Sequence, residues 1–462
     1  MEKEIFTKRS HIHAPVETVF NWHSRPGALE RLSPPWDPLQ VIEKKGGIEK
    51  GATAVLKMKV GPVPFKWVAE HTDCEANRFF RDRQVKGPLA HWVHTHLFAP
   101  DGANACFIED QIEYALRFHP FGNFFGGSLV RNKLESIFHY RHTTTAWDIA
   151  ALMSGRNKTK TPMNILISGA SGIIGSALIP FLTTGGNHVT RLVRRGTLPE
   201  KKEVRWDPGS GCLNPADLGG INTVIHLAGE NIGEGRWTKE KKKRILESRI
   251  KGTLLIARTA AALDPRPEVL ICASAIGYYG NRNDRVLTEK DGPGNDFISR
   301  VCHEWEKAAS PAIEKGIRVV FLRIGVALTP AAGALGKFLP FFQAGLGGKI
   351  GTGKQFMSWI GIDDVIGAIY HVLINDELEG PVNVVSPNPV TNLEFTKTLG
   401  KVLSRPALFS VPAAAIRLAF GEMGREIPLS STRVQPEKLL KTGYRFRTPD
   451  IEGALSHLLG KS

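Results

Sequence analysis

The sequence predicts an α/β protein whose main domain is a doubly wound parallel sheet with a small C-terminal lobe, preceded by a separate α+β domain. Three observations carry this prediction. Apolar strand segments alternate with helical segments from residue 163 onward. The first of these strands runs into a glycine-rich turn and a helix. A polar segment at 155–162 divides this part from residues 1–150, where strand-like segments follow one another without long helices between them.

Residues 1–150 begin the chain with a pattern of strands and turns. Strand-like segments are separated by turns such as GPVP and PDGAN, and they lie at 4–12, 53–60, 64–72, 78–86, 90–99 and 104–114. Two short helical pieces, split by Arg25-Pro26-Gly27, follow the first strand, and an amphipathic segment from Gly126 to about Ala150 closes the domain. This order and the opening HIHAPVETVFNW resemble the helix-grip fold of the START-like (SRPBCC, polyketide-cyclase-like) domains. The resemblance implies an apolar cavity that binds a ligand.

Histidines in this domain raise the question of a metal site. On a strand, His94 and His96 face one way and His91 the other, so the three do not converge. His11 and His13 are the only further strand-borne pair. The five cysteines are scattered and form no C-x-x-C pair. We therefore expect no metal ligands and no disulfide framework.

The segment 151–162 is expected to be a linker, because its second half, GRNKTKTP, is polar and ends in proline. A dinucleotide-binding domain begins at its first strand, so the second domain is assigned to 163–462. Its closing segment spans about 405–460.

The stretch MNILISGASGIIGSALIPFL, residues 163–182, predicts a nucleotide site. A buried strand leads into Gly169, Gly172 and Gly175, and an apolar helix follows at once. The first glycine permits a sharp turn, the second lets backbone N–H groups approach phosphates, and the third lets helix pack on strand. The helix N-terminus adds N–H donors and a positive dipole end for the anion.

The second strand, 188–196, indicates which nucleotide binds. An NAD site usually has a carboxylate about 20 residues past the glycines, where it accepts hydrogen bonds from the ribose 2′-hydroxyl. This chain has Arg194 and Arg195 there, and guanidinium groups pair well with a 2′-phosphate. The sequence therefore favours NADP over NAD.

Further strands at 223–228, 269–274 and 317–324 alternate with helical stretches at 239–262 and 297–315. Ligands of such sheets bind at the carboxyl ends of the strands. This rule points to the residues after each strand, at 227–230, at 274–280 and beyond Arg323.

At these positions the chain resembles the atypical, extended short-chain dehydrogenase/reductases, in particular the epimerase-like family with a C-terminal DUF1731-type domain. The matching pieces include ISGASGIIG, HLAGENI, SAIGYYG, LRIGVAL and GGKIGTGKQFMSWIGIDDV. The resemblance implies an NAD(P)-binding Rossmann domain whose cofactor contacts are Gly169, Ser171, Gly172, Ile173, Ile174, Gly175, Arg194, Arg195, Leu227, Ala228, Gly229 and Arg249. One departure is Gly361, where the family usually has histidine.

The Tyr-x-x-x-Lys pair of the wider superfamily is absent, because none of the six tyrosines has lysine four residues later. The apparent counterparts are Ile298 and Cys302, and the expected serine falls on Ala275. The sequence leaves two possibilities open. One is an NADP-dependent oxidoreductase or epimerase (isomerase) that acts on an apolar small molecule with a nonstandard acid or base. The other is a non-catalytic NADP sensor or scaffold. Candidate proton-transfer residues are Ser274, Tyr278 and Tyr279, with Glu230 and Lys354 as further choices.

Composition and charge limit the classes of molecule that the protein is expected to bind. The net charge of +15 suggests nucleic-acid binding as one possible function. The densest basic stretch, at 236–253, however has the pattern of a solvated helix face, and no aromatic residues alternate with its basic ones. The amino terminus has no signal-peptide pattern and no apolar run is long enough to span a bilayer. We therefore expect a cytoplasmic protein that binds small molecules and no nucleic acid.

Overall fold

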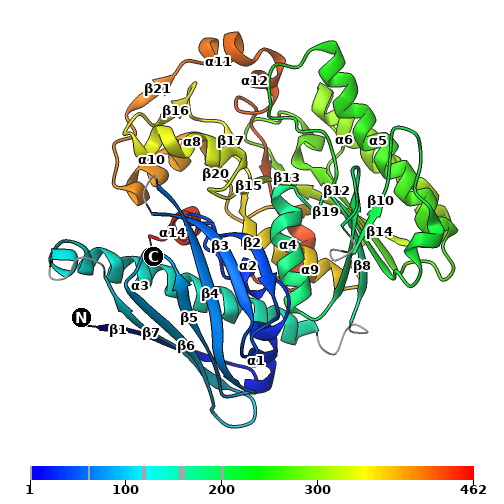
Figure 1. Cartoon of the computed structure of the whole chain (residues 1–462). Coiled ribbons are helices and arrows are strands. Elements are labelled where there is room, and N and C mark those ends of the chain that lie inside the picture. Colours follow the sequence, from blue (N-terminus) through cyan, green and yellow to red (C-terminus); the bar gives the residue numbers. More distant parts are fainter. Residues whose placement is uncertain (1–2, 61–62, 117–120, 156–161, 199–201, 462) are drawn as a thin grey trace. The chain divides into compact units, whose positions relative to one another are not determined.

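A computed structural model of the chain describes residues 3–60, 63–116, 121–155, 162–198 and 202–461 (Figure 1). Contacts between Cα atoms divide the chain into two compact units. Unit 1 comprises Met1–Asn157 with the short segments Pro180–Gly186 and His457–Ser462, and unit 2 comprises Lys158–Ile179 and Asn187–Ser456. Each unit is described by itself below.

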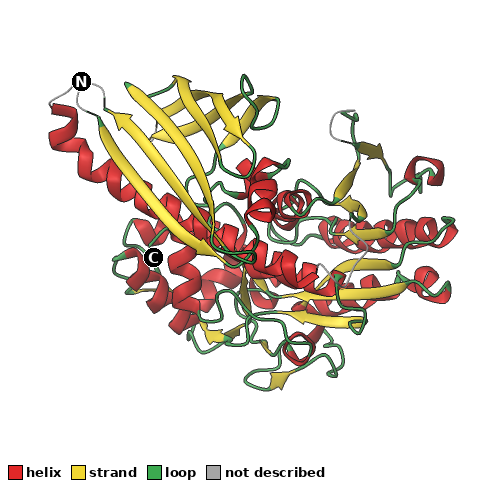
Figure 2. Ribbon diagram, turned by 90° about the horizontal axis from the view of Figure 1, so that it is seen from below, coloured by secondary structure: helices red, strands yellow, loops and turns green. Residues whose placement is uncertain are grey.

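Unit 1 is built on a seven-stranded antiparallel sheet with the order β1-β7-β6-β5-β4-β3-β2. Figure 2 shows these long, curved strands with the longest helix, α3, lying along them. The elements are β1 (Glu4–Ile12), α1 (Val16–Ser24), α2 (Ala28–Arg31), β2 (Gln40–Lys45), β3 (Thr53–Val60), β4 (Val63–Glu75), β5 (Phe79–Lys86), β6 (His91–Pro100), β7 (Cys106–Ala115) and α3 (Phe121–Gly155).

Alternation along the strands explains the core of unit 1. Phe6 on β1 and Ile112 on β7 point to the face that α3 covers, where they pack against Leu134 and Phe138. The predicted strands are all present, and the predicted closing helix continues to Gly155. Strand β2 was not predicted, because five of its six residues are exposed and it therefore carries no apolar alternation.

Unit 2 contains a seven-stranded sheet with the order β10-β9-β8-β11-β12-β14-β19, in which all neighbouring pairs are parallel. Its strands are β8 (Asn164–Ser168), β9 (His188–Val193), β10 (Glu203–Arg205), β11 (Thr223–His226), β12 (Val269–Ala275), β14 (Arg318–Ile324) and β19 (Gly380–Val384). The helices that connect them are α4 (Ile173–Thr184), η2 (Pro215–Leu218), α5 (Lys239–Ala262), η3 (Ile276–Tyr279), α6 (Phe297–Lys307), α7 (Ser310–Glu314) and α9 (Ile362–Leu373).

This sheet is the predicted doubly wound one. Every residue of β11 is buried, as expected for a strand with a helix layer on each face. Leu166 and Leu270 pack in one apolar cluster with Ile256 and Ala257 of α5 and Ala312 of α7, so these helices cover one face. The chain winds from β8 outward through β9 to β10 and then crosses to β11, so the direction of winding reverses between β8 and β11. A reversal of this kind opens a crevice at the carboxyl ends of the two strands.

The rest of unit 2 consists of short strands paired in twos and small helices. They are β13 (Val286–Leu287), β15 (Val326–Leu328), α8 (Gly333–Gln343), β16 (Gly348–Ile350), β17 (Phe356–Met357), β18 (Trp359–Gly361), β20 (Val390–Thr391), α10 (Asn392–Leu403), β21 (Phe409–Val411), α11 (Ala413–Phe420), α12 (Glu422–Glu426), β22 (Arg433–Val434), α13 (Glu437–Lys441) and α14 (Ile451–Leu459). Among the described residues, no helix combines the length and apolarity needed to cross a membrane.

Candidate functional site

The turn after β8 has the backbone geometry that the first glycine was predicted to provide. Gly169 has φ +75°, a conformation that residues with a Cβ rarely adopt. A Cβ there would lie 2.7 Å from the carbonyl carbon of Leu227 and 2.8 Å from the nitrogen of Ala228. Glycine at 169 therefore lets the turn after β8 meet the loop after β11 at the crevice.

The other two glycines differ in what surrounds them. A Cβ on Gly175 would lie 2.3 Å from the carbonyl oxygen of Gly169, so α4 packs directly on the turn. A Cβ on Gly172 would meet only that same oxygen, at 3.2 Å, and nothing else within 4 Å. Gly172 and its neighbour Ser171 are exposed, and α4 begins one residue later, at Ile173. N–H groups in the first turn of a helix have no intrahelical acceptor. Open space beside free donors fits a dinucleotide pyrophosphate.

Arg194 and Arg195 directly follow β9, which pairs with β8 in parallel with Leu192 opposite Ser168. They therefore lie at the same edge of the sheet as the glycine turn. Both are exposed, and neither pairs with a carboxylate within the described part of the chain. The two guanidinium groups are free to bind a phosphate.

Hydrogen bonds from β8 and α5 support the end of β11 and the loop after it, Leu227 to Gly229. The hydroxyl of Ser168 lies 2.6 Å from Nδ1 of His226. Arg249 on α5 donates from Nη1 to the carbonyl oxygens of Glu230, at 3.0 Å, and Ile245, at 3.2 Å. Arg249 is thus a buried support of this loop, and a Cβ on Gly229 would lie 3.3 Å from Cζ of Arg249.

Two of the three candidate proton-transfer residues belong to a buried network. Ser274, near the end of β12, donates to Oε1 of Glu306 at 2.7 Å. Tyr279 donates to Oδ1 of Asn383 at 2.7 Å and accepts from Nη1 of Arg323 at 3.1 Å. Arg323 and Glu306 form a two-bonded ion pair at 2.9 and 2.8 Å. Burial raises the pKa of Tyr279 to about 12. Its hydroxyl is therefore a neutral member of a structural network.

Tyr278 differs from its neighbour. Its ring lies against the guanidinium of Arg323, whose central carbon is 3.4 Å from the ring centroid. Its hydroxyl makes no hydrogen bond to any residue that the structure describes. The structure thus distinguishes two adjacent tyrosines that the sequence could not separate. The sequence analysis did not identify Glu306 and Asn383 as site residues. Both lie in segments that also resemble the epimerase-like family, DFIS…WE for Glu306 and NVVSPNPV for Asn383, and this resemblance could have pointed to them.

The positions of the missing dyad are filled by apolar packing. Ile298 and Cys302 on α6 lie against η3, and a Cβ on Gly277 would be 2.3 Å from Cγ2 of Ile298. Both belong to the apolar cluster that includes Tyr278. Burial raises the pKa of Cys302 to about 12, so its thiol stays protonated. Neither residue supplies a usable acid or base.

The remaining candidates lie apart from this network. Glu230 pairs with Nζ of Lys241 at 2.7 Å, and this hydrogen bond lowers the pKa of the glutamate, which is therefore ionised. Lys354 is exposed and lines a separate cavity of about 400 Å³ together with Asn281 and Arg417. Gly361 ends β18 and directly precedes α9, and a Cβ there would lie 3.3 Å from Oγ1 of Thr448.

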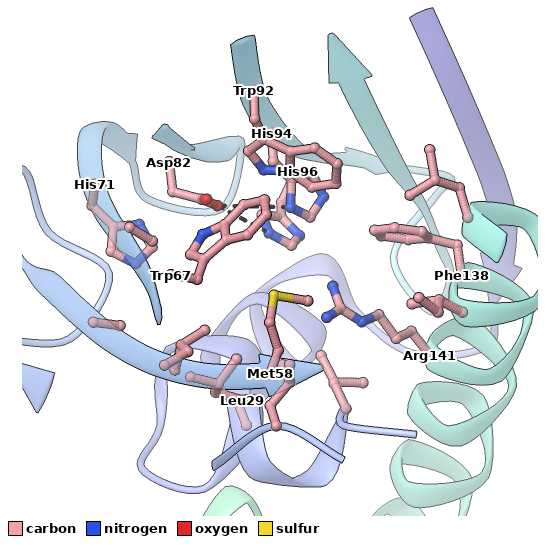
Figure 3. A pocket seen from close by; sticks show the side chains of 18 of the residues that line it. Leu29, Met58, Trp67, His71, Asp82, Trp92, His94, His96, Phe138 and Arg141 are labelled. Atoms are coloured by element: carbon pink, nitrogen blue, oxygen red, sulfur yellow. Dashed lines mark ion pairs between the residues drawn. The ribbon is translucent and has the colours of Figure 1, made fainter. Parts of the chain in front are cut away.

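Unit 1 contains a cavity of about 490 Å³ between the sheet and its helices. Figure 3 shows that its lining combines apolar side chains, among them Leu29, Met58, Trp67, Trp92 and Phe138, with the polar side chains of His71, Asp82, His94, His96 and Arg141. Burial lowers the pKa of the His94 and His96 imidazoles. The cavity suits an amphipathic molecule with one polar end.

The parallel sheet, the glycine turn and the crevice at the reversal of strand order define unit 2 as a doubly wound, dinucleotide-binding type of domain. Comparison with known proteins agrees, since residues 165–385 match the NAD dependent epimerase/dehydratase family. The chain belongs to this family. Residues 3–142 match the family described as polyketide cyclase / dehydrase and lipid transport, and residues 411–458 match a domain of unknown function, DUF1731. The resemblances drawn from the sequence are confirmed.

Individual relatives cover one or both units. Epimerase family protein Mb2239 of Mycobacterium bovis is 41% identical over 293 residues, which are 63% of this chain and 96% of that protein. A crystal structure described as the nucleoside-diphosphate sugar epimerase from Corynebacterium glutamicum is similar over 98% of this chain and 90% of its own, with 32% identity and a TM-score of 0.80. The structure of human epimerase family protein SDR39U1 (isoform 2) with NADPH covers 64% of this chain and 99% of its own, with 32% identity and a TM-score of 0.60.

Proposed function

We propose that the protein binds NADP in the crevice between β8 and β11 and acts as an oxidoreductase or epimerase on a small, apolar molecule. One observation carries the proposal: the open space at Gly172 lies at the same sheet edge as the two unpaired guanidinium groups of Arg194 and Arg195. The NADPH bound to the human relative supports the choice of nucleotide. When bound, this cofactor supplies hydride transfer.

We assign the parts of the site as follows. Backbone N–H groups of Ser171, Ile173, Ile174 and Gly175 bind the pyrophosphate, while the N–H of Gly172 donates to the carbonyl oxygen of Gly169 at 3.0 Å. Arg194 and Arg195 bind the 2′-phosphate. Leu227, Ala228 and Gly229 line the crevice, and Arg249 positions this loop.

The proton-transfer residue of the proposal is Tyr278. Its hydroxyl has no partner among the described side chains, whereas Ser274 and Tyr279 are engaged with Glu306, Arg323 and Asn383. The guanidinium against the Tyr278 ring offers positive charge where a phenolate would form. Ser274 and Tyr279 then act as positioning residues that hold Arg323 and the end of β12.

Titration of the full-length protein with NADPH and NADH tests the nucleotide assignment. Replacing Arg194 and Arg195 by serine removes contacts worth about 1.5–3 kcal/mol each, so NADPH should bind at least ~10-fold more weakly while NADH is unaffected. The matched control is Arg191→Ser, on the same strand but before its end. Equal affinities of the unchanged protein for the two nucleotides would refute the assignment.

A second function is favoured by the packing at Ile298 and Cys302, which leaves no dyad. In this alternative the protein is a non-catalytic NADP sensor or scaffold. Small molecules that co-purify with the native chain, identified by mass spectrometry, separate the two. NADPH oxidation in the presence of the recovered molecule, lost in Tyr278→Phe, supports the enzyme. Tight NADPH retention without turnover supports the sensor.

A further inference from the structure

Three polar side chains that line the cavity in unit 1, Asp82, His94 and His96, lie together with Asp110, and strand register explains why. Asp82 on β5 is the direct cross-strand partner of His94 on β6. His96, two residues further along β6, is the direct partner of Asp110 on β7. Directly opposed residues on one face have Cβ atoms about 4.5–5.5 Å apart, so their side chains meet. These residues are remote from the nucleotide crevice in sequence and belong to the other unit.

Asp110 determines which nitrogen of each imidazole carries hydrogen. Its Oδ1 lies 2.9 Å from Nε2 of His94 and 2.6 Å from Nδ1 of His96, and its Oδ2 lies 2.7 Å from Nε2 of His142. An ionised carboxylate can only accept hydrogen bonds, so these three nitrogens donate. In a neutral imidazole the other nitrogen then has a free lone pair. For His94 this is Nδ1, and for His96 it is Nε2.

Both of these nitrogens lie near the same carboxylate, that of Asp82. Nδ1 of His94 is 3.7 Å and Nε2 of His96 is 3.9 Å from Oδ2 of Asp82. One ligand atom from each of the three residues lies within 4.8 Å of the other two. These separations of 3.7 and 3.9 Å exceed a hydrogen bond, so neither imidazole is hydrogen-bonded to Asp82. A cation between them would satisfy all three, since the ligands of a tetrahedral zinc ion lie about 3.4 Å apart.

We propose that Asp82, His94 and His96 bind a divalent transition-metal ion of the Zn²⁺ or Fe²⁺ type, with an open coordination position that faces the cavity. Two imidazoles and one carboxylate are a ligand set that such ions prefer, and sites with three protein ligands leave room for a water or substrate oxygen. Asp110 is the outer carboxylate that orients metal-binding histidines through their second nitrogen.

Neighbouring side chains restrict the two imidazoles and provide a binding partner for a ligand at the open coordination position. The ring of Phe80 stacks on His96 at 4.1 Å, and the edge of Phe138 meets His94 at 5.3 Å, which restricts both imidazoles. Arg141 points from α3 toward the same cavity (Figure 3), and its buried Nε has no hydrogen-bond partner among the residues that the structure describes. A ligand oxygen on the metal would lie near this guanidinium, while the apolar wall takes the rest of the molecule.

The expectation of no metal ligands was drawn from the histidines of one strand alone. As predicted from the alternation, His91 takes no part, since its Nε2 lies 2.7 Å from Glu113. The third ligand, Asp82, comes from the neighbouring strand and carries no motif in the sequence.

Metal titration of the untagged, full-length protein after chelator treatment tests the proposal. Calorimetry with Zn²⁺ should give one ion per chain. Asp82→Asn and His94→Ala should each weaken binding at least ~100-fold, and Asp110→Asn should weaken it about 10- to 100-fold. His91→Ala, on the same strand but facing away, is the matched control and should bind as the unchanged protein does.

Binding that is unchanged in Asp82→Asn and His94→Ala, or no binding above that of an unrelated protein, would overturn the proposal. If these variants fail to fold, a measurement on the unchanged protein still tests the proposal. Co²⁺ loading followed by X-ray absorption should show two imidazole nitrogens and carboxylate oxygen around the ion. A first shell with fewer than two imidazoles would mean that the ion binds elsewhere.

Discussion

Replacement of Gly172 and of Gly175 should separate nucleotide binding from folding, because the two glycines have different surroundings. A Cβ at 172 has a single tight contact, 3.2 Å to the oxygen of Gly169, and otherwise open space. A Cβ at 175 would lie 2.3 Å from that oxygen and 2.9 Å from Cα of Ala170, and neither backbone atom can move without shifting α4 or the turn.

These distances set the expected magnitudes. Gly172→Val should lower the free energy of unfolding by about 1 kcal/mol, since valine is a poorer residue than glycine directly before the first helical residue. Its methyl groups occupy the space proposed for the pyrophosphate. Overpacking of this kind costs about 1–3 kcal/mol, which corresponds to an increase in the Kd for NADPH of about 5- to 150-fold. Gly175→Ala should lose about 1–3 kcal/mol of stability as well as affinity.

The assay combines NADPH fluorescence titration with thermal unfolding of the full-length chain. Gly196→Ala is the control, because a Cβ there meets nothing within 4 Å. An unchanged Kd for NADPH in Gly172→Val would refute the placement of the pyrophosphate over this glycine. Unchanged stability in Gly175→Ala would refute the close packing of α4 on the turn.

Three further predictions concern the core and the division of the chain. Arg323→Met should destabilise unit 2 by about 3–5 kcal/mol in denaturant unfolding, because it leaves the buried carboxylate of Glu306 uncompensated. Burial, and then Arg249, lower the pKa of His226 from 6.5 to about 3, so the unfolded chain binds more protons between these values. The stability contributed by neutral His226 is complete above pH 6.5 and falls by up to ~1.4 kcal/mol per pH unit as the pH drops toward 3, a slope that His226→Gln should reduce. Cleavage between 156 and 162, beyond the end of α3, should give two soluble fragments, of which the one from residue 163 onward retains NADPH.

Each of these three predictions can be contradicted by a specific result. A stable Arg323→Met protein would show that the ion pair is dispensable, and an equal pH slope in His226→Gln would assign the slope to other groups. Loss of NADPH binding by the larger fragment would mean that residues 1–150 complete the nucleotide domain.

The nucleotide site was predictable because it is local in sequence. A buried strand, three glycines and a helix follow one another within 20 residues, and backbone sterics alone relate the glycines to the turn. The two arginines were predictable for the same reason, since they directly follow the next strand of the same unit. Apolar patterns likewise predicted most strands of both sheets, but not the exposed β2 or the strands β10 and β19 of the parallel sheet.

The two buried polar clusters depended on tertiary structure. Asp82, His94 and Asp110 come from three strands, and only the register of those strands brings them together, since a shift by one residue would turn each side chain to the opposite face. Glu306 and Arg323 meet because a helix packs on the end of a strand 17 positions away in sequence. The sequence determined the glycine turn after β8 and the fold class of each domain, because these follow from short-range sterics and periodicity. Tertiary packing decided which titratable groups share a cavity, which tyrosine keeps a free hydroxyl and where three metal-type ligands converge, because those depend on contacts between segments that the sequence does not place side by side.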